Sequence, residues 1–139
     1  MRVPIPLLLL TLSCASGPPQ PATLSAGNDA CSHCRMVVSD LHFAAQLVAP
    51  GEEPRFFDDI GCLASYLETN PAPLEAALYV ADHQTGEWVN ARFAIYTRVD
   101  SLQTPMGSHL VAHSDERSRK ADPVVARGIA QTYDSIFGD

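Results

Sequence analysis

A cluster of sulfur ligands stands near the start of this chain of 139 residues. Cys31, Cys34 and Met36 form a C-x-x-C-x-M pattern. Two thiolates and a thioether are soft, polarizable ligands, so they favour a soft monovalent ion such as Cu(I) over harder cations. The pattern therefore predicts a Cu(I) site that includes Cys31, Cys34 and Met36, in a protein that handles copper.

The residues before this cluster are typical of a bacterial lipoprotein signal. Arg2 supplies a positive start, residues 3–12 form an apolar core, and Cys14 follows a small residue. The core is too short for a transmembrane helix, which needs about 20 apolar residues, so we expect a cleaved signal over 1–14. Cleavage would leave Cys14 to carry a lipid, which anchors the protein to a bacterial membrane and faces it toward the periplasm or the exterior. An ordinary cleaved signal would give a soluble exported protein instead.

Composition divides the rest of the chain. Residues 15–30 are rich in Pro, Gly, Ser, Ala and Thr without apolar periodicity, and predict a disordered tether. Residues 31–139 suffice for one compact domain or two small subdomains with a shared interface. The formal net charge is −7, and no stripe of Lys and Arg is interleaved with aromatics, so nucleic-acid binding is excluded. The one dense basic run, 117–120, is interpreted as a solvated loop.

Short apolar runs and turn signals predict the secondary structure of the domain. The expected strands are residues 43–49, 55–57, 77–81, 88–99 and 110–113. One helix is expected to start at Asp58 or Asp59 and end at Asn70, and a second to run from Asp122 to Gly138. This order of elements favours an α+β fold with mixed or antiparallel pairing.

Five motifs together carry a resemblance to a known family. They are Cys34-Arg35-Met36, Phe57-Asp58-Asp59-Ile60-Gly61-Cys62, Tyr79-Val80-Ala81-Asp82, Trp88-Val89-Asn90-Ala91 and Thr104-Pro105-Met106-Gly107. With these motifs the chain resembles the NosL family, whose members are lipid-anchored accessory proteins of nitrous-oxide reductase that bind Cu(I) and supply copper for its catalytic cluster. The resemblance implies two small ββαβ units. The second unit is expected to be incomplete, because no convincing closing strand follows the helix expected at 123–137.

The resemblance also implies ligands and a partner. It places the family's Cys-x-Met pair on Cys34 and Met36 and its second methionine on Met106. It implies a metallochaperone, not an enzyme, that delivers Cu(I) to an exported copper enzyme, most specifically nitrous-oxide reductase. No arrangement of nucleophile and base or of paired carboxylates predicts catalytic residues, and no cofactor besides Cu(I) is expected.

Three further residues are open from the sequence. His109 and His113 lie four positions apart and so on one face of a strand or helix, which makes them candidate ligands, although exposed polar residues are the alternative. We include His109 in the predicted site. Cys62, beside apolar neighbours, is either a buried inert thiol or a third sulfur ligand.

Two other functions fit the same cysteines. An exported C-x-x-C pair can act as a thiol-disulfide oxidoreductase, but this pair follows a tether rather than a strand that leads into a helix. A structural zinc site could use Cys31, Cys34, Cys62 and a histidine, but the second C-x-x-C pair that would make this interpretation strong is missing.

Overall fold

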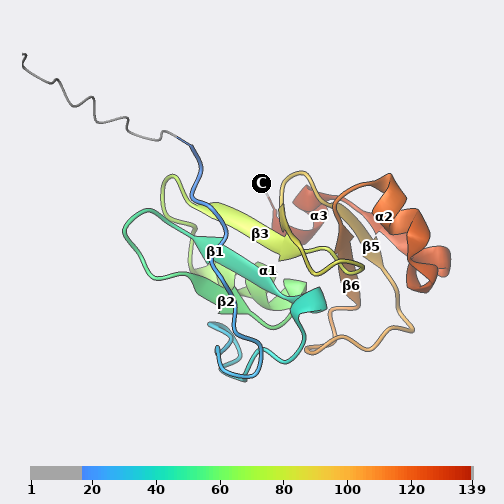
Figure 1. Cartoon of the computed structure of the whole chain (residues 1–139), viewed down its shortest axis with the longest axis horizontal. Helices are drawn as coiled ribbons and strands as arrows, with labels where there is room; N and C mark the ends of the chain where they lie inside the picture. The colour runs from blue at the N-terminus through green and yellow to red at the C-terminus, as the bar shows by residue number, and fades with distance from the viewer. Residues whose placement is uncertain (1–16, 139) are drawn as a thin grey trace, which may run out of the picture.

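The computed structural model describes residues 17–138 and contains two antiparallel sheets (Figure 1). The strands of the first sheet are β1 (Ala45–Val48), β2 (Arg55–Phe57), β3 (Ala77–Ala81) and β4 (Trp88–Asn90). Those of the second are β5 (Ile95–Arg98), β6 (Leu110–His113) and β7 (Ile129–Gln131). The α-helices are α1 (Ile60–Thr69), α2 (Glu116–Ala121) and α3 (Tyr133–Phe137), and the 3-10 helices are η1 (Leu41–Phe43) and η2 (Pro123–Arg127).

Both sheets repeat one topology. The first unit runs β1, β2, α1, β3 with strand order β2-β1-β3 before β4 is added, and the second runs β5, β6, α2, β7 with order β6-β5-β7. In each unit the first strand is central and pairs antiparallel with the other two. The predicted α+β fold of two ββαβ units is confirmed, and β7 is the closing strand that the sequence did not reveal.

The first unit follows the sequence closely. The predicted strands lie at β1, β2 and β3, and the predicted helix is α1. Asp59 is its N-cap, because its side chain accepts a hydrogen bond from the Gly61 backbone N–H at 2.7 Å. Ile60 and Leu63 are buried on the face of α1 that packs against the sheet, so the apolar spacing reports the core correctly.

The single strand expected over 88–99 is wrong. The chain leaves the first sheet after β4 and enters the second at β5. Asn90 causes the change of direction, since its side chain accepts a hydrogen bond from the Arg92 N–H at 3.0 Å and its carbonyl accepts one from the Phe93 N–H. Such Asx turns let an asparagine replace strand pairing with a local bond.

The long helix expected at the C-terminus is also wrong. Residues 123–137 form η2, β7 and α3 in place of one helix. Gly128 explains the difference: a Cβ at this position would overlap Thr97 Cγ2 and lie 3.0 Å from the Arg98 carbonyl oxygen. The glycine thus allows β7 to approach β5 closely, which the apolar periodicity of the segment does not show.

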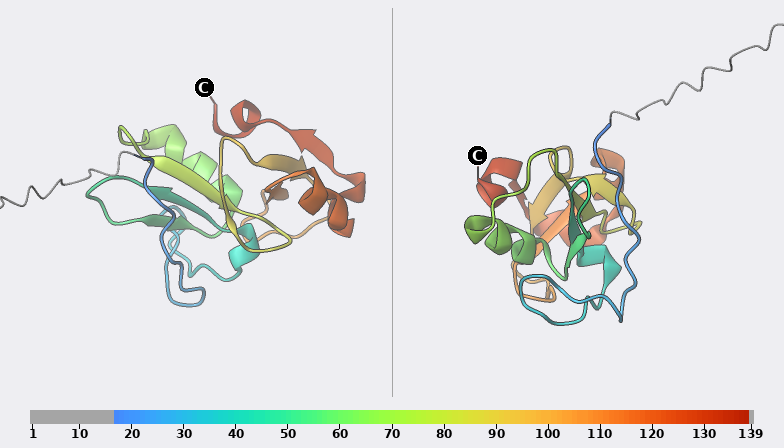
Figure 2. Two further views of the ribbon diagram at one scale, coloured as in Figure 1. Left: turned by 45° about the horizontal axis from the view of Figure 1, so that its top comes forward. Right: turned by 90° about the vertical axis from the view of Figure 1, so that its left-hand side faces the viewer.

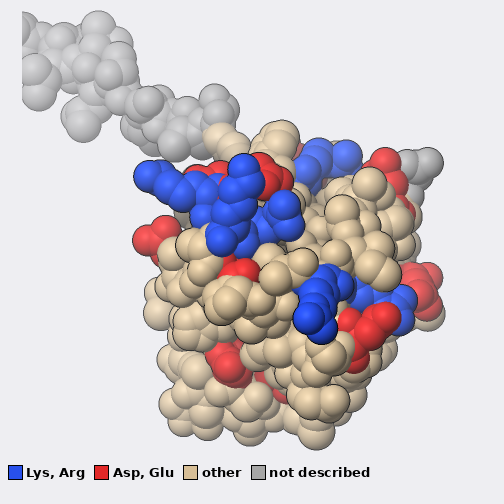
Figure 3. Space-filling model, turned by 90° about the vertical axis from the view of Figure 1, so that its right-hand side faces the viewer, with Lys and Arg blue, Asp and Glu red and all other residues tan. Residues whose placement is uncertain are grey.

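The basic run 117–120, expected as a loop, lies in α2. Asp115 is the N-cap of this helix, and its side chain accepts from the Ser118 N–H at 2.8 Å. Lys and Arg side chains gather on this end of the molecule, with acidic side chains between them (Figure 3). Arg119 pairs with Glu116 at 3.3 Å, which is in keeping with an exposed mixed-charge face.

The segment expected as a disordered tether differs from that expectation where it is described. Residues 17–30 run along the first unit (Figure 2). The Ala22 N–H donates to Gln46 Oε1 at 2.8 Å, and the Tyr79 hydroxyl donates to the Pro19 carbonyl at 2.7 Å. These strand side chains hold a proline-rich segment that has few backbone donors of its own. The domain boundary at residue 31 stays a prediction.

The predicted signal peptide and the predicted lipidation site at Cys14 lie outside the described residues. Among the residues that are described, no helix is both long and apolar enough to cross a membrane.

The two units are joined where β3 and β6 end. The His83 N–H donates to the Ala112 carbonyl at 2.8 Å, and Asp82 and Ala112 form a parallel bridge. The buried Asp82 carboxylate accepts from the Ser114 N–H at 2.7 Å and from the Ser118 hydroxyl at 2.9 Å. Burial opposes its charge, but these hydrogen bonds outweigh it and hold the pKa of Asp82 well below its usual value. One carboxylate thus ties the first sheet to the second unit.

Gly128→Ala tests the close approach of β7 to β5. We expect it to destabilise the protein by about 1–3 kcal/mol, because the added methyl overpacks the contact with Thr97. Chemical denaturation measures this. Gly17→Ala, where nothing lies within 4 Å of the added Cβ, is the control. If 123–137 were one helix, Gly128→Ala would instead stabilise it by about 1 kcal/mol, so the sign decides.

Candidate metal centre

A tight turn brings the sulfurs of the C-x-x-C pair together. The Cys31 N–H donates to the Met36 carbonyl at 2.7 Å, and the Arg35 N–H donates back to the Cys31 carbonyl at 3.0 Å. Arg35 takes the left-handed conformation, with φ 69°, which closes the turn. The Cys34 N–H then points at Cys31 Sγ at 3.5 Å. The pair is therefore part of a loop, and does not stand at a helix N-terminus.

The turn is fixed to the end of β2. The Ser32 N–H donates to the Phe56 carbonyl at 2.8 Å, and Cys31 forms a parallel bridge with Phe56. The Asp58 carboxylate accepts from the Ser39 N–H at 2.9 Å on the far side of the turn. These contacts place the cysteine loop beside the start of α1.

A third thiol meets the pair there. Cys62 lies in the first turn of α1, and the Sγ atoms of Cys31, Cys34 and Cys62 all lie within 4.8 Å of one another. All three are free cysteines. Cys31 and Cys62 are buried, and Cys34 is half-buried. The sequence left Cys62 open between an inert thiol and a ligand, and the fold brings it into the cluster.

The three thiols differ in acidity. Burial opposes ionisation of Cys31, but hydrogen bonds from the backbone N–H groups of Cys34, Asp58 and His33 outweigh it and lower the pKa of its thiol. Burial raises the pKa of Cys34, and burial together with the nearby Cys31 sulfur raises the pKa of Cys62 strongly. The site therefore favours one thiolate, at Cys31, and resists a second negative charge.

Met106 reaches the cluster from the second unit. Asp59 holds it: one carboxylate oxygen caps α1 through Gly61, and the other accepts from the Met106 N–H at 3.0 Å. Gly61 lets this loop come close, since a Cβ there would lie 2.7 Å from Ser108 Cβ. The backbone of Met106 is thus fixed against the helix that carries Cys62.

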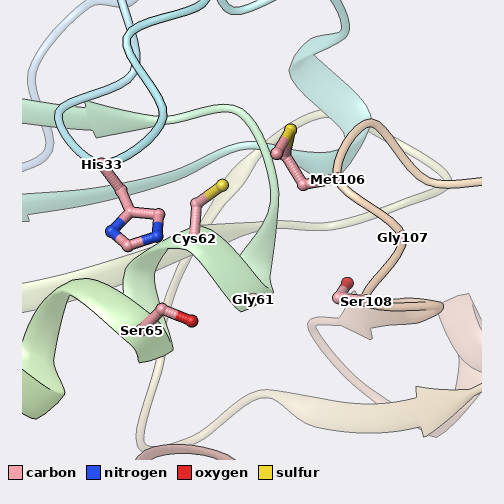
Figure 4. A pocket seen from close by; sticks show the side chains of 7 residues that line it. All are labelled: His33, Gly61, Cys62, Ser65, Met106, Gly107 and Ser108. Atoms are coloured by element: carbon pink, nitrogen blue, oxygen red, sulfur yellow. The ribbon is translucent and has the colours of Figure 1, made fainter.

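Cys62 and Met106 line one pocket of about 230 Å³. Figure 4 shows their side chains entering it from α1 and from the loop before β6. His33 lines the same pocket with its ring toward Cys62, although an extended segment would have pointed it away. His33 takes this orientation because the cysteine loop forms a tight turn and is not extended.

Two other predicted ligands, Met36 and His109, lie outside the helices and strands. Met36 is 48% exposed on the cysteine loop. His109 has φ 61°, and its Nδ1 bonds to the Leu102 carbonyl at 2.7 Å. Among the described His, Cys, Asp and Glu side chains, the groups that could share an ion with the thiols do not include His109. The ligand roles of Met36 and His109 stay predictions. His113 lies elsewhere, beside Asp122.

Comparison with known proteins now decides the family. The sequence profile named NosL matches residues 21–126. The chain belongs to the NosL family. The matched range holds the three thiols and Met106, so the resemblance drawn from the motifs is confirmed.

The fold agrees with that assignment. The crystal structure described as the copper chaperone NosL from Shewanella denitrificans superimposes with a TM-score of 0.68 at 20% sequence identity. The match covers 86% of this chain and 97% of that chain. At this identity the likeness shows that the NosL fold is shared. A search of curated proteins finds no match.

Thiol labelling tests the arrangement of the cluster. We expect iodoacetamide to modify Cys34 first in the folded, reduced protein, because Cys31 and Cys62 are buried. Since burial raises the pKa of Cys34 above its usual value, its rate at pH 8 should be lower than that of a free cysteine peptide and should level off at a higher pH than the rate of the peptide.

Peptide mass mapping after timed labelling gives the rate at each site. The unfolded protein is the control, in which all three thiols should react alike. Labelling of Cys62 as fast as Cys34 in the folded protein would contradict the buried cluster.

Proposed function

We propose that this chain is an exported metallochaperone that binds Cu(I) with the thiols of Cys31, Cys34 and Cys62 and the thioether of Met106. The observation that carries the proposal is the convergence of three thiols from two segments, one of which, Cys62, lines a pocket together with Met106. An all-sulfur donor set matches a soft monovalent ion. Met36, on the loop that carries Cys31 and Cys34, is a further thioether donor in this proposal.

The kinds of donor support Cu(I) over a structural zinc ion. Structural zinc sites are built from thiolates, imidazoles and carboxylates, whereas Met106 offers a thioether beside Cys62. A thioether is a soft, neutral ligand that suits Cu(I).

The exposure of the ligands supports transfer. Cys31 and Cys62 are buried, whereas Cys34 is half-buried and Met106 is 43% exposed. The sulfur ligand of an acceptor can therefore approach the ion from the side of Cys34 and Met106. Because a thioether is a neutral ligand and adds no charge attraction, it can be exchanged while the thiolate of Cys31 still holds the ion. No covalent bond of a substrate changes in this exchange, so the chain acts as a carrier and not as an enzyme.

Family membership supports an exported protein, and the copper chaperone from Shewanella denitrificans, which shares the fold, supports copper as the cargo. The acceptor that we propose is nitrous-oxide reductase, as the motifs imply. We propose that Cys14 carries a lipid that keeps the chaperone at a bacterial membrane.

An anaerobic titration of the reduced protein with Cu(I), against a chromogenic chelator, tests the site. We expect one tightly bound ion. Cys34→Ala should lower the affinity for Cu(I) at least about 100-fold, because loss of a residue that only contacts a ligand already costs up to about 100-fold. Met106→Ala and Met36→Ala each remove a neutral ligand and should cost about tenfold, or about 1.4 kcal/mol. Ser65→Ala, in the same pocket but without sulfur, is the matched control.

The same titration tests the geometry without removing a ligand. Gly61→Ala should weaken Cu(I) binding, because its Cβ would push the loop of Met106 off α1. If both Gly61→Ala and Met106→Ala bound Cu(I) with unchanged affinity, Met106 would not be a ligand. Oxidised protein should not bind, since a disulfide between Cys31 and Cys34 uses both sulfurs; tight binding by that form would overturn the thiolate site.

Transfer of Cu(I) to a copper-free enzyme tests which protein is the acceptor. The Cu(I)-loaded chain should restore activity to copper-free nitrous-oxide reductase faster than the chelator-bound ion does at equal free copper. A strain that lacks the chain yet reduces nitrous oxide fully under copper limitation would exclude this acceptor and leave the Cu(I) site intact.

A further inference from the structure

A second group of ligating side chains lies where the two units join. His83 follows β3, His113 ends β6, and Asp122 precedes η2. One nitrogen of each ring and one carboxylate oxygen all lie within 4.8 Å of one another. His83 Nδ1 is 2.6 Å from Asp122 Oδ2, and His113 Nε2 is 3.0 Å from the same oxygen. Three elements distant in sequence thus aim three donor atoms at one point.

This group is separate from the thiol cluster. Met106 and Ser108 precede β6, whereas His113 is its last residue, so the two groups lie at opposite ends of that strand. The donors also differ in kind, since one group offers sulfur and the other nitrogen and oxygen. The proposed copper site therefore makes no use of these three residues.

The group is buried. The side chains of His113 and Asp122 are fully buried, and that of His83 is 13% exposed. His113 Nδ1 is buried without a hydrogen-bond partner. An unpaired buried polar atom costs about 1–3 kcal/mol, and a metal held at Nε2 would leave Nδ1 unpaired. The cost therefore indicates that the histidine is kept for its Nε2 contact with Asp122 and not for packing. The donor aimed at Asp122 is the one polar contact of the His113 ring among the described residues.

The donor set points to a borderline divalent ion. Two neutral imidazoles and one carboxylate suit Zn²⁺, which takes three protein ligands and leaves a fourth position for water. The short contacts to Asp122 need to open by only fractions of an ångström to admit an ion at ordinary bond lengths. Residual exposure of His83 gives that fourth position access to solvent.

The surroundings of the group are already ordered. Asp122 Oδ1 accepts from the Val124 N–H at 3.0 Å, which leaves Oδ2 for a metal. The His83 ring packs against Phe43 with centroids 5.1 Å apart, and its backbone N–H binds the Ala112 carbonyl. Ligands held by outer contacts of this kind bind metal with little reordering.

We propose that His83, His113 and Asp122 form a second metal site, which binds one Zn²⁺ and fastens the first unit to the second. Soft Cu(I) and borderline Zn²⁺ are thereby sorted by ligand chemistry onto two sites of one chain. Because the ion bridges β3, β6 and η2, its binding stabilises the folded junction.

Zn²⁺ titration of the full chain, with its thiols first filled by Cu(I), tests the site by calorimetry. We expect one Zn²⁺ per chain, with the affinity reduced more than about 100-fold by His83→Gln or Asp122→Asn. Asparagine keeps the capping oxygen of position 122, so Asp122→Asn should still fold. His42→Gln is the matched control, because His42 pairs with Asp40 at 3.0 Å on the exposed surface.

A second arm uses Cys31→Ser/Cys34→Ser/Cys62→Ser, which removes the thiol cluster. This variant should still bind one Zn²⁺, and its melting temperature should rise with Zn²⁺ unless Asp122→Asn is added. Absence of Zn²⁺ binding in both arms, or binding unchanged by His83→Gln and Asp122→Asn, overturns the proposal. Cu(I) binding is measured separately, so failure of the copper site and failure of this site give different results.

Discussion

The two oxygens of the Asp59 carboxylate join the parts of the molecule on which the proposed copper site depends. One oxygen caps the N-terminus of helix α1, and the other accepts a hydrogen bond from the Met106 N–H in the second unit. The carboxylate is fully buried, so both bonds lie out of competition with water. Without this bridge Cys62 and Met106 would belong to separate elements with no fixed distance between them. Gly61 completes the contact, because only a residue without a side chain leaves room for Ser108.

A second constraint is the cost of buried charge. Two backbone N–H groups of the cysteine loop and that of Asp58 after β2 point toward Cys31 and offset its burial, while Cys34 and Cys62 lack comparable support. A cluster of this kind holds one negative charge readily and a second one only at high cost. The half-buried Cys34 and the exposed Met106 leave one side of the cluster accessible, as the proposed transfer of Cu(I) requires. The stability of the site and its ability to release the ion thus follow from the same uneven burial.

The repeated ββαβ topology explains why the ligating residues gather at the joints between units. Each unit buries the inner face of its own sheet, so its side chains there are committed to packing. Proposed ligands lie instead where one unit meets the other: Met106, held by Asp59, before the start of β6, and His83, His113 and Asp122 near its end. Strand β6 lies between Met106 and the group of His83, His113 and Asp122. Binding at either joint therefore depends on how the units are held together.

The sequence alone determined the family and the elements of the first unit, and it predicted most of the proposed sulfur ligands. It did so because Cys34, Met36 and Met106 lie in motifs, and because the apolar spacing of α1 and of strands β1 to β3 reflects local burial. Three features were decided only by tertiary structure. The entry of Cys62 into the thiol cluster depends on the close approach of the cysteine loop and α1, which no local pattern encodes. The division of 123–137 into η2, β7 and α3 depends on the contact of Gly128 with Thr97. The meeting of His83, His113 and Asp122 depends on the junction of the two sheets, and residues that are distant in the chain become ligands of one site only when long-range pairing brings them together.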